Sequence, residues 1–164
     1  MKNETLAAAV ISPNDLLTQW QGHRNLTRRV IDAFPEDKLF SYSVGGMRPF
    51  SELALEMIHM AVPSVAGIIT GKWKSFGESE AEAKPTTKAG LLKLWDESTE
   101  KLNELFPQIK LERFQEVENA FGQYEGTNHA LIFYCIDNEI HHRGQGYVYL
   151  RTLNIEPPFF WERQ

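Results

Sequence analysis

The residues with the clearest potential for chemistry lie in one segment, Asp137 to Tyr149, which reads DNEIHHRGQGYVY. Asn138 stands four residues before His142, and a second histidine, His141, directly precedes His142. Four residues are about one turn of an α-helix, so the side chains of Asn138 and His142 share a face. Histidine pairs at this spacing often hold a metal ion, but the first position here is an asparagine. The segment therefore predicts either a metal site with one changed ligand or a cluster of hydrogen-bonded side chains.

A third polar residue, His59, is predicted to point into the same apolar core from another helix. An unpaired polar side chain in a core costs about 1–3 kcal/mol, so three of them on two helices need a common explanation. One explanation is a metal ion, because catalytic zinc-type sites use three protein ligands and leave one position open. The other is a hydrogen-bond cluster, with or without water, in which each polar group satisfies a neighbour. Either way, the predicted site consists of His59, Asn138 and His142.

Further titratable residues flank this set. His141 is rotated by about 100° from His142 around the helix axis, so the two imidazoles do not face one ion equally. Asp137 and His141 form their own i, i+4 pair, which either orients the site or lies on the helix surface. In an enzyme, these two are the nearest candidates for a general acid or base. His23 is predicted to be solvated, and Arg143 to be solvated or ion-paired.

The pattern of apolar residues predicts an all-α fold, a four-helix bundle. Helix starts are marked by Ser12 before a proline and by Thr87, and helix ends by Gly71 and Pro107. The expected helices cover residues 13–34, 51–70, 87–106 and 127–153. A long second connection allows one crossover instead of a simple up-and-down order. The ambiguous stretch LERFQEVENAFGQYEG is interpreted as a short helical turn and a loop, and no strands are predicted.

The second helix is expected to turn one line of residues towards the core. That line comprises Leu55, His59, Val62, Ala66 and Ile69. Pro63 lies inside this pattern, where its ring conflicts with the carbonyl group of His59, so a kink is expected there.

Composition limits the class of protein. The 164 residues indicate a single domain, 1–164. A net charge of −5 argues against binding to nucleic acid or to an anionic membrane surface, both of which require clustered Lys and Arg. The single cysteine, Cys135, excludes an internal disulfide, fits a reducing compartment and is interpreted as a packing residue. With no evident signal peptide or membrane span, a cytoplasmic protein is expected.

Two segments carry a resemblance to a known family. EIHHRGQGYVYLR followed by LNIEPP resembles the C-terminal helix of the DinB/YfiT-like family, and MRPFSELALEMIHM resembles its second helix. The resemblance implies a four-helix bundle of the metalloenzyme type that is often a homodimer. It also implies a divalent metal ion (nickel, zinc or iron) held by three histidines, and in some members a metal-dependent hydrolase or thiol-dependent transferase. The implied ligand positions are His59, Asn138 and His142.

The chain departs from this pattern at Asn138, because an amide oxygen is a poor ligand for nickel or zinc compared with imidazole. Two functions are therefore carried forward. In the first, His59 and His142 hold a divalent ion, Asn138 or water completes the shell, and Asp137 or His141 acts as acid or base on an unknown small-molecule substrate. In the second, the protein has lost the metal, and the same residues form a polar plug or the floor of a small-molecule pocket.

Overall fold

The computed structural model of the protein describes residues 10–73 and 84–164, and in them the chain is mostly helical. Its elements are the α-helices α1 (Pro13–Ala33), α2 (Glu36–Ser41), α3 (Phe50–Thr70), α4 (Lys88–Leu105) and α5 (Asn128–Thr152), the 3-10 turns η1 (Phe106–Gln108) and η2 (Leu111–Gln115), and the strands β1 (Val117–Ala120) and β2 (Tyr124–Thr127). The four long helices begin and end within two residues of the expected positions, so that expectation is confirmed.

Local capping accounts for these helix ends. The Ser12 Oγ atom accepts a hydrogen bond from the Asp15 amide at 3.1 Å, and the Asp15 carboxylate accepts one from the Ser12 amide at 3.0 Å. This reciprocal pair satisfies amide groups that the first turn of α1 leaves without partners. Thr87 caps α4 with a single hydrogen bond, which its Oγ1 atom accepts from the Gly90 amide at 3.1 Å. Gly71 ends α3 with φ of 67°, a left-handed conformation that favours glycine.

Two parts of the fold differ from the expectation. The short helix α2 was not predicted, and the stretch interpreted as a turn and a loop contains η2 and an antiparallel hairpin of β1 and β2. The hairpin reverses at Phe121 and Gly122, whose φ angles are 55° and 71°. Each strand has only four residues, too few for an alternating pattern to stand out, and pairing with its neighbour stabilises it.

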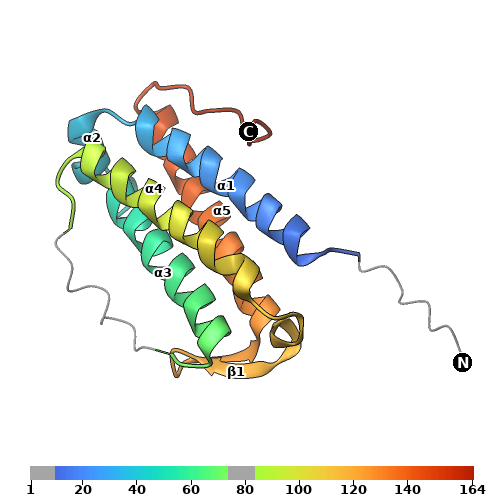
Figure 1. The fold of residues 1–164 in the computed structure, drawn as a ribbon. Helices are drawn as coiled ribbons and strands as arrows, with labels where there is room; N and C mark the ends of the chain where they lie inside the picture. Colours follow the sequence, from blue (N-terminus) through green and yellow to red (C-terminus); the bar gives the residue numbers. More distant parts are fainter. Residues whose placement is uncertain (1–9, 74–83) are drawn as a thin grey trace, which may run out of the picture.

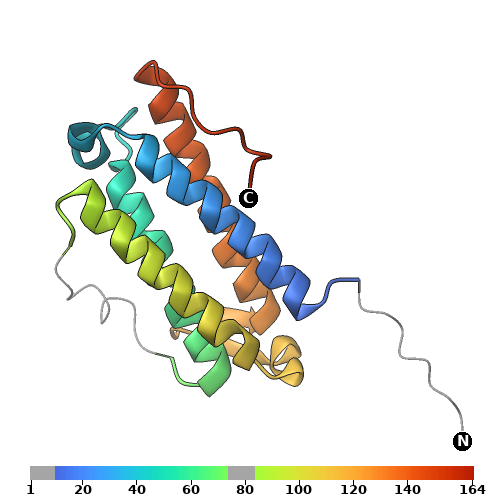
Figure 2. The same cartoon turned by 45° about the horizontal axis from the view of Figure 1, so that its top comes forward.

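The four long helices lie side by side, with α2 near one end and the β-hairpin at the other (Figures 1 and 2). α3 and α4 run in the same direction, and α1 and α5 run in the opposite one, so the chain makes the crossover that its long connection allows. Within this arrangement α5 packs against both α1 and α3. Side chains of α5 can therefore meet two different partner helices from two adjacent faces.

The core of the described residues consists of two apolar clusters with polar side chains between them. One cluster surrounds Trp20, Leu102 and Ile132 near the hairpin, and the other surrounds Ile31, Trp95 and Leu150 near α2. Buried polar residues lie between these clusters along three helices: His23, Arg24 and Thr27 on α1, Ser98 on α4, and Glu139, His142 and Arg143 on α5. The middle of the protein is thus a polar layer.

The expected inward line of α3 is wrong in its rotation about the helix axis. Of its five residues only Leu55 is buried, whereas His59 is half-buried. The buried face instead runs through Ala54, Ile58, Ala61, Val65 and Ile68. α3 is apolar on nearly all sides, so periodicity alone does not decide which side turns inward. By length and composition α3 could also cross a membrane, but most of it is buried in the protein, as is usual for a core helix.

Candidate functional site

Three polar side chains meet where α3 faces α5. Glu56, on α3, accepts two hydrogen bonds at its Oε1 atom, from the Asn138 Nδ2 atom at 3.0 Å and from the His142 Nε2 atom at 2.9 Å. Asn138 and His142 share one face of α5, as their spacing predicts. The structure therefore brings together two of the three predicted ligand residues, and the side chain that joins them is the carboxylate of Glu56. We call Glu56, Asn138 and His142 the central cluster.

Both ring nitrogens of His142 are engaged. Nε2 faces Glu56, and Nδ1 lies 2.8 Å from the Oε1 atom of Gln145, whose amide nitrogen lies 3.3 Å from the sulfur of Met47. Both nitrogens thus lie at hydrogen-bond distance from side-chain oxygen atoms, Nδ1 from that of Gln145 and Nε2 from that of Glu56.

Arg48, which precedes α3, completes the surroundings of the Glu56 carboxylate. Its Nη2 atom lies 2.5 Å from the Glu56 Oε2 atom. Burial on its own raises the pKa of Glu56, but hydrogen bonds from His142, Arg48 and Asn138 outweigh it and lower that pKa to about 2. Glu56 is therefore ionised at neutral pH and pairs with the cationic side chain of Arg48. The Oδ1 atom of Asn138, in contrast, is buried and has no hydrogen-bond partner among residues 10–73 and 84–164.

The other predicted site residues lie outside the central cluster. His59 follows Glu56 by three residues on α3, but within residues 10–73 and 84–164 it makes no hydrogen bond or ion pair. Asp137 and His141 are exposed on α5, and the His141 ring lies 5.1 Å from the His142 ring. The sequence analysis did not identify Glu56 as a site residue. The feature that could have identified it is a single carboxylate inside the apolar run LALEMI.

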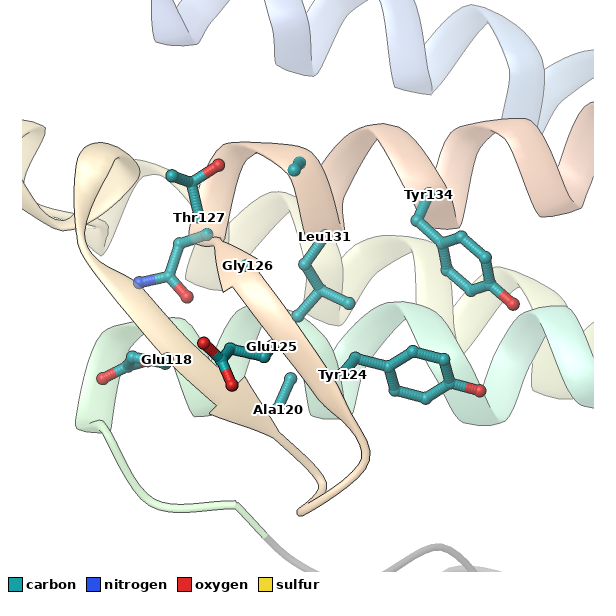
Figure 3. A pocket seen from close by; sticks show the side chains of 10 residues that line it. Glu118, Ala120, Tyr124, Glu125, Gly126, Thr127, Leu131 and Tyr134 are labelled. Carbon is teal, nitrogen blue, oxygen red and sulfur yellow. The ribbon is translucent and has the colours of Figure 1, made fainter.

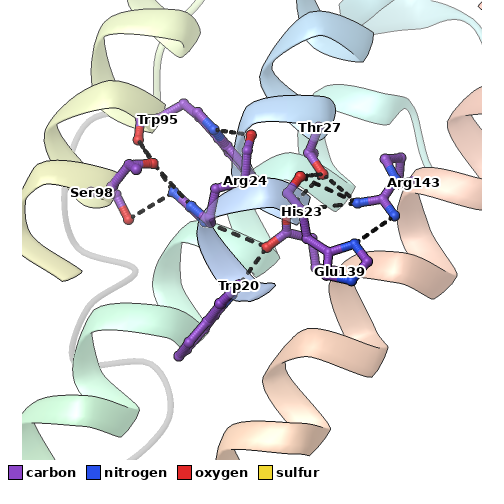
Figure 4. Close-up of polar contacts among 9 residues, drawn as sticks. Trp20, His23, Arg24, Thr27, Trp95, Ser98, Glu139 and Arg143 are labelled. Atoms are coloured by element: carbon purple, nitrogen blue, oxygen red, sulfur yellow. Dashed lines mark hydrogen bonds and ion pairs between the residues drawn. The ribbon is translucent and has the colours of Figure 1, made fainter. Parts of the chain in front are cut away.

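A second group of polar side chains is fully enclosed where α5 faces α1 (Figure 4). Glu139 accepts hydrogen bonds from Thr27 Oγ1 at 2.7 Å and from Trp20 Nε1 at 3.3 Å. Two guanidinium groups flank its carboxylate, that of Arg24 at 3.9 Å and that of Arg143 at 4.0 Å. Burial raises the pKa of Glu139, and the two arginines and the hydrogen bonds oppose that effect. We call this group, with His23, the buried network.

Arg24 ties the buried network to α4. Its guanidinium group lies 3.6 Å from the centre of the Trp95 ring, and it donates to Thr99 Oγ1 at 3.0 Å and to the Trp95 carbonyl oxygen at 3.2 Å. Stacking on an aromatic face suits the planar guanidinium group, which makes its burial tolerable. The network therefore links three helices through α1.

The expectation for His23 is corrected by this network, whereas Arg143 is ion-paired with Glu139, one of its two expected alternatives. His23 is buried, not solvated, and its Nδ1 atom lies 3.0 Å from Arg143 Nη2. Arg143 is buried as well and is held by His23 and Thr27. Burial and the charges of Arg143 and Arg163 lower the pKa of His23 to about 4, so its imidazole is neutral at pH 7. The overlooked signal was the i, i+4 spacing of Glu139 and Arg143 on α5.

Comparison with known proteins places the chain in a family. A family model described as the DinB family matches residues 1–163. The chain belongs to the DinB family. A DinB family relative, the uncharacterized protein YjoA of Bacillus subtilis (strain 168), is 26% identical over 151 residues, which are 92% of this chain and 97% of that protein.

Two solved structures share the fold. The crystal structure of the DinB-like protein YjoA from Bacillus subtilis has a TM-score of 0.73 at 23% identity, over 92% of this chain and 100% of that one. A DinB-like protein from Bacillus cereus has a TM-score of 0.69 at 16% identity, over 88% and 95% of the two chains. At these identities the likeness concerns the fold alone.

The donor atoms of this DinB family member do not fit a three-imidazole metal centre. In the two described stretches of the chain, no three His, Cys, Asp or Glu side chains are grouped closely enough to hold a metal ion. The His142 Nε2 atom is engaged with Glu56 at 2.9 Å, and the amide oxygen that Asn138 offers is a poor ligand for nickel or zinc beside imidazole. The Arg48 guanidinium group adds positive charge where a dication would bind.

Three small residues of α5, Gly146, Gly144 and Cys135, differ in their surroundings. A Cβ atom added to Gly146 would lie 2.5 Å from the Phe50 ring, so this glycine lets α5 approach α3 closely. Gly144 has no such neighbour within 4 Å. Cys135 is buried beside Ser64, and burial raises its pKa to about 12, which suits the packing role expected for it.

Proposed function

We propose that this DinB family protein is a metal-independent small-molecule-binding protein, with an internal ion-paired cluster in place of the family's metal ion. The observation that carries the proposal is the position of the Glu56 carboxylate. It accepts hydrogen bonds from Asn138 and His142, which occupy the positions of two family ligands, and from Arg48. The cluster is thus held together by its own charges.

Competition between protein groups and a metal ion supports this proposal. To bind a divalent ion, His142 has to release its Nε2 proton and give up the bond to Glu56. The Arg48–Glu56 pair has to rearrange as well, because a carboxylate shared with a guanidinium group is a weaker ligand. A site that needs both changes binds first-row ions less tightly than three preformed imidazoles do. The same proposal includes three further expectations. The fold is a four-helix bundle, the protein is located in the cytoplasm, and two copies of the chain form a homodimer.

A metal-dependent hydrolase or thiol-dependent transferase is the second candidate. One observation favours it: the Oδ1 atom of Asn138 is buried without a partner, as a displaced ligand atom could be. In that case His59, Asn138 and His142 are the metal ligands for nickel, zinc or iron, and Asp137 or His141 is the acid or base. These assignments remain predictions.

Elemental analysis of protein purified without a histidine tag separates the two candidates. We expect well under one equivalent of nickel, zinc or iron per chain, and no change in melting temperature when a chelator is added. A ligand that binds only the folded state stabilises it, by about 2.7 kcal/mol at a hundredfold excess over its dissociation constant. One equivalent of metal per chain, with a lower melting temperature in the chelator, would instead establish the metal-dependent candidate.

A further inference from the structure

A small cavity lies between the β-hairpin and the first turns of α5 (Figure 3). Its volume is about 150 Å³, and most of its wall is apolar. Leu131, Ala120 and the rings of Tyr124 and Tyr134 provide the larger apolar surfaces, and Glu118 and Glu125 provide the charged groups. An apolar cavity of about this volume accommodates a molecule the size of benzene. The cavity is therefore suited to one compact chemical group.

The two tyrosines form a continuous aromatic wall. Their ring centres are 5.6 Å apart and their planes are inclined by 37°, so the rings stand side by side and do not enclose a slot. Tyr124 is 41% exposed and Tyr134 is 44% exposed, which leaves part of each ring open to a ligand. In Figure 3 both phenol groups extend in the same direction, along α5 towards its C-terminal end.

The charged groups around this cavity are acidic. Among the residues that the structure describes, no Lys, Arg or His lines it. The hairpin segment from residue 116 to 127 contains three glutamates and no Lys or Arg. Arg113 pairs with Glu116 and Glu118, whereas Glu125 forms no ion pair with any residue in the described part of the chain. A ligand that enters the cavity therefore meets aromatic rings and excess negative charge.

We propose that this cavity binds a small organic cation through an alkylated ammonium group placed against the Tyr124–Tyr134 wall and next to Glu125. Aromatic faces attract ammonium groups through the ring quadrupole, and recognition of quaternary ammonium by several aromatic rings is the best-known use of that attraction. The carboxylate adds long-range attraction, and the apolar wall accepts the methyl groups. The proposal rests on the small-molecule-binding function above and names its ligand class.

The cavity and the central cluster belong to one stretch of α5. Tyr134, Asn138 and His142 follow one another at intervals of four residues, so they lie along one face of the helix. Burial, together with Tyr124 and Glu56, raises the pKa of Tyr134, which keeps its phenol protonated at neutral pH. The ammonium group thus binds at the hairpin end of this face, where Tyr134 lines the cavity.

A titration with matched probes tests this proposal. Choline and 3,3-dimethylbutan-1-ol have nearly the same shape, but only choline carries a charge. We expect choline to bind with about threefold to tenfold higher affinity, the range that corresponds to one or two partly exposed cation–π contacts. The readout is NMR titration of the purified full chain, followed at the resonances of Tyr124 and Tyr134. Phosphocholine, which adds an anionic phosphate, should bind more weakly than choline because the charged lining groups are carboxylates.

Three variants sharpen the experiment. Tyr134→Leu should weaken choline binding about threefold or more, whereas Tyr134→Phe should stay within about twofold of the parent because it keeps the ring. Phe133→Leu is the matched control, since Phe133 is an exposed aromatic residue on α5 that does not line this cavity. Glu125→Gln, at an exposed position, should weaken choline binding and reduce its dependence on salt.

Equal affinity for choline and its neutral analogue overturns the proposal, and so does unchanged choline binding in Tyr134→Leu that remains folded by circular dichroism. Tighter binding of phosphocholine than of choline would assign the cavity to a headgroup that carries phosphate and would contradict a simple cation. Elemental analysis is independent of these results. A metal-free protein that does not discriminate between the probes refutes the ligand class alone, whereas one equivalent of metal refutes the proposed function.

Discussion

The Oε1 atom of Glu56 lies 2.9 Å from the Nε2 atom of His142, so a carboxylate on α3 meets an imidazole on α5 at hydrogen-bond distance. In the DinB-like pattern His142 is a metal-ligand position. Here the same nitrogen points at a side chain of the protein itself, which is in turn held by Arg48 and Asn138. The carboxylate of Glu56 thus joins side chains from both helices at this site.

Glu56→Gln should destabilise the protein by about 1–2 kcal/mol, because the variant loses hydrogen bonds to a charged acceptor. Glu52 is an exposed carboxylate on the same helix, so Glu52→Gln is the control and should change stability by less than about 0.5 kcal/mol. The Glu56 effect should depend on pH. The folded-state pKa of Glu56, about 2, is below its ordinary value of 4.5, so its contribution is complete above about pH 4.5 and is lost as the pH falls towards 2.

Denaturant unfolding of the parent and both variants between pH 2 and pH 7 measures this contribution. The difference between parent and Glu56→Gln should shrink over that acidic range. A difference that stays constant down to pH 2 would show that Glu56 is not held as an ionised acceptor.

Asn138→His should raise the affinity of this site for nickel and zinc above that of the parent. The new imidazole would stand one helical turn from His142, and Glu56 supplies a carboxylate that already contacts both positions. Two imidazoles and a carboxylate bind first-row divalent ions, so nickel or zinc should raise the melting temperature of the variant more than that of the parent. Calorimetric titration and thermal melts measure both effects. If the parent binds one equivalent tightly and the variant gains nothing, Asn138 is not the replaced ligand, and His141 is the next candidate.

Gly146→Ala and Gly144→Ala should have opposite effects on stability. At position 146 the added methyl group would lie 2.5 Å from the Phe50 ring, which stacks on Phe34, so we expect a loss of about 1–3 kcal/mol. At position 144 nothing lies within 4 Å, and replacing a glycine in a helix by alanine should gain up to about 1 kcal/mol. Chemical denaturation measures both. Equal effects of the two substitutions would contradict the close approach of α5 to α3.

His23 should make the protein less stable in mild acid. Its folded-state pKa, about 4, lies below its ordinary value of 6.5, so between these pH values the unfolded chain takes up a proton that the folded protein does not. Stability from this residue is therefore complete above about pH 6.5 and falls as the pH approaches 4. In His23→Gln this part of the pH dependence should disappear, while an amide oxygen can still accept from Arg143. Parallel melting curves of parent and variant from pH 7 to pH 4 would refute this expectation.

Glu139→Ala should be the most damaging of these substitutions, with a loss of about 3–5 kcal/mol, because it leaves the buried guanidinium groups of Arg24 and Arg143 without their carboxylate. Glu139→Gln keeps the volume and some hydrogen bonds and should cost less. Urea denaturation of the two variants measures the difference. A cost for Glu139→Ala below about 1 kcal/mol would mean that water compensates both arginines, contrary to their burial.

Local sequence determined the helices of this protein and one part of its site. Ser12, Thr87 and Gly71 act within their own turns, so helix ends could be predicted without knowledge of any distant residue. The placement of Asn138 and His142 on one face follows from the helical period in the same way. The hairpin was not predicted because its two short strands are stabilised by pairing with each other. Neither strand has an alternation of apolar and polar residues long enough to identify it.

Only the tertiary structure decided which partners these side chains meet. α3 is apolar on almost all sides, so packing alone set its rotation, and that rotation brought Glu56 to His142 and left His59 half-buried without a polar partner among the described residues. The same applies to His23 and Arg143, which look like surface residues but lie in a layer between two apolar clusters. Burial of Arg143 is possible because Glu139, on the same helix, and Thr27, on α1, satisfy its charge and hydrogen bonds, and the His23 ring lies at hydrogen-bond distance from Arg143. Spacing along a helix is set by covalent geometry, whereas contacts between helices depend on how whole surfaces pack, which no single segment specifies.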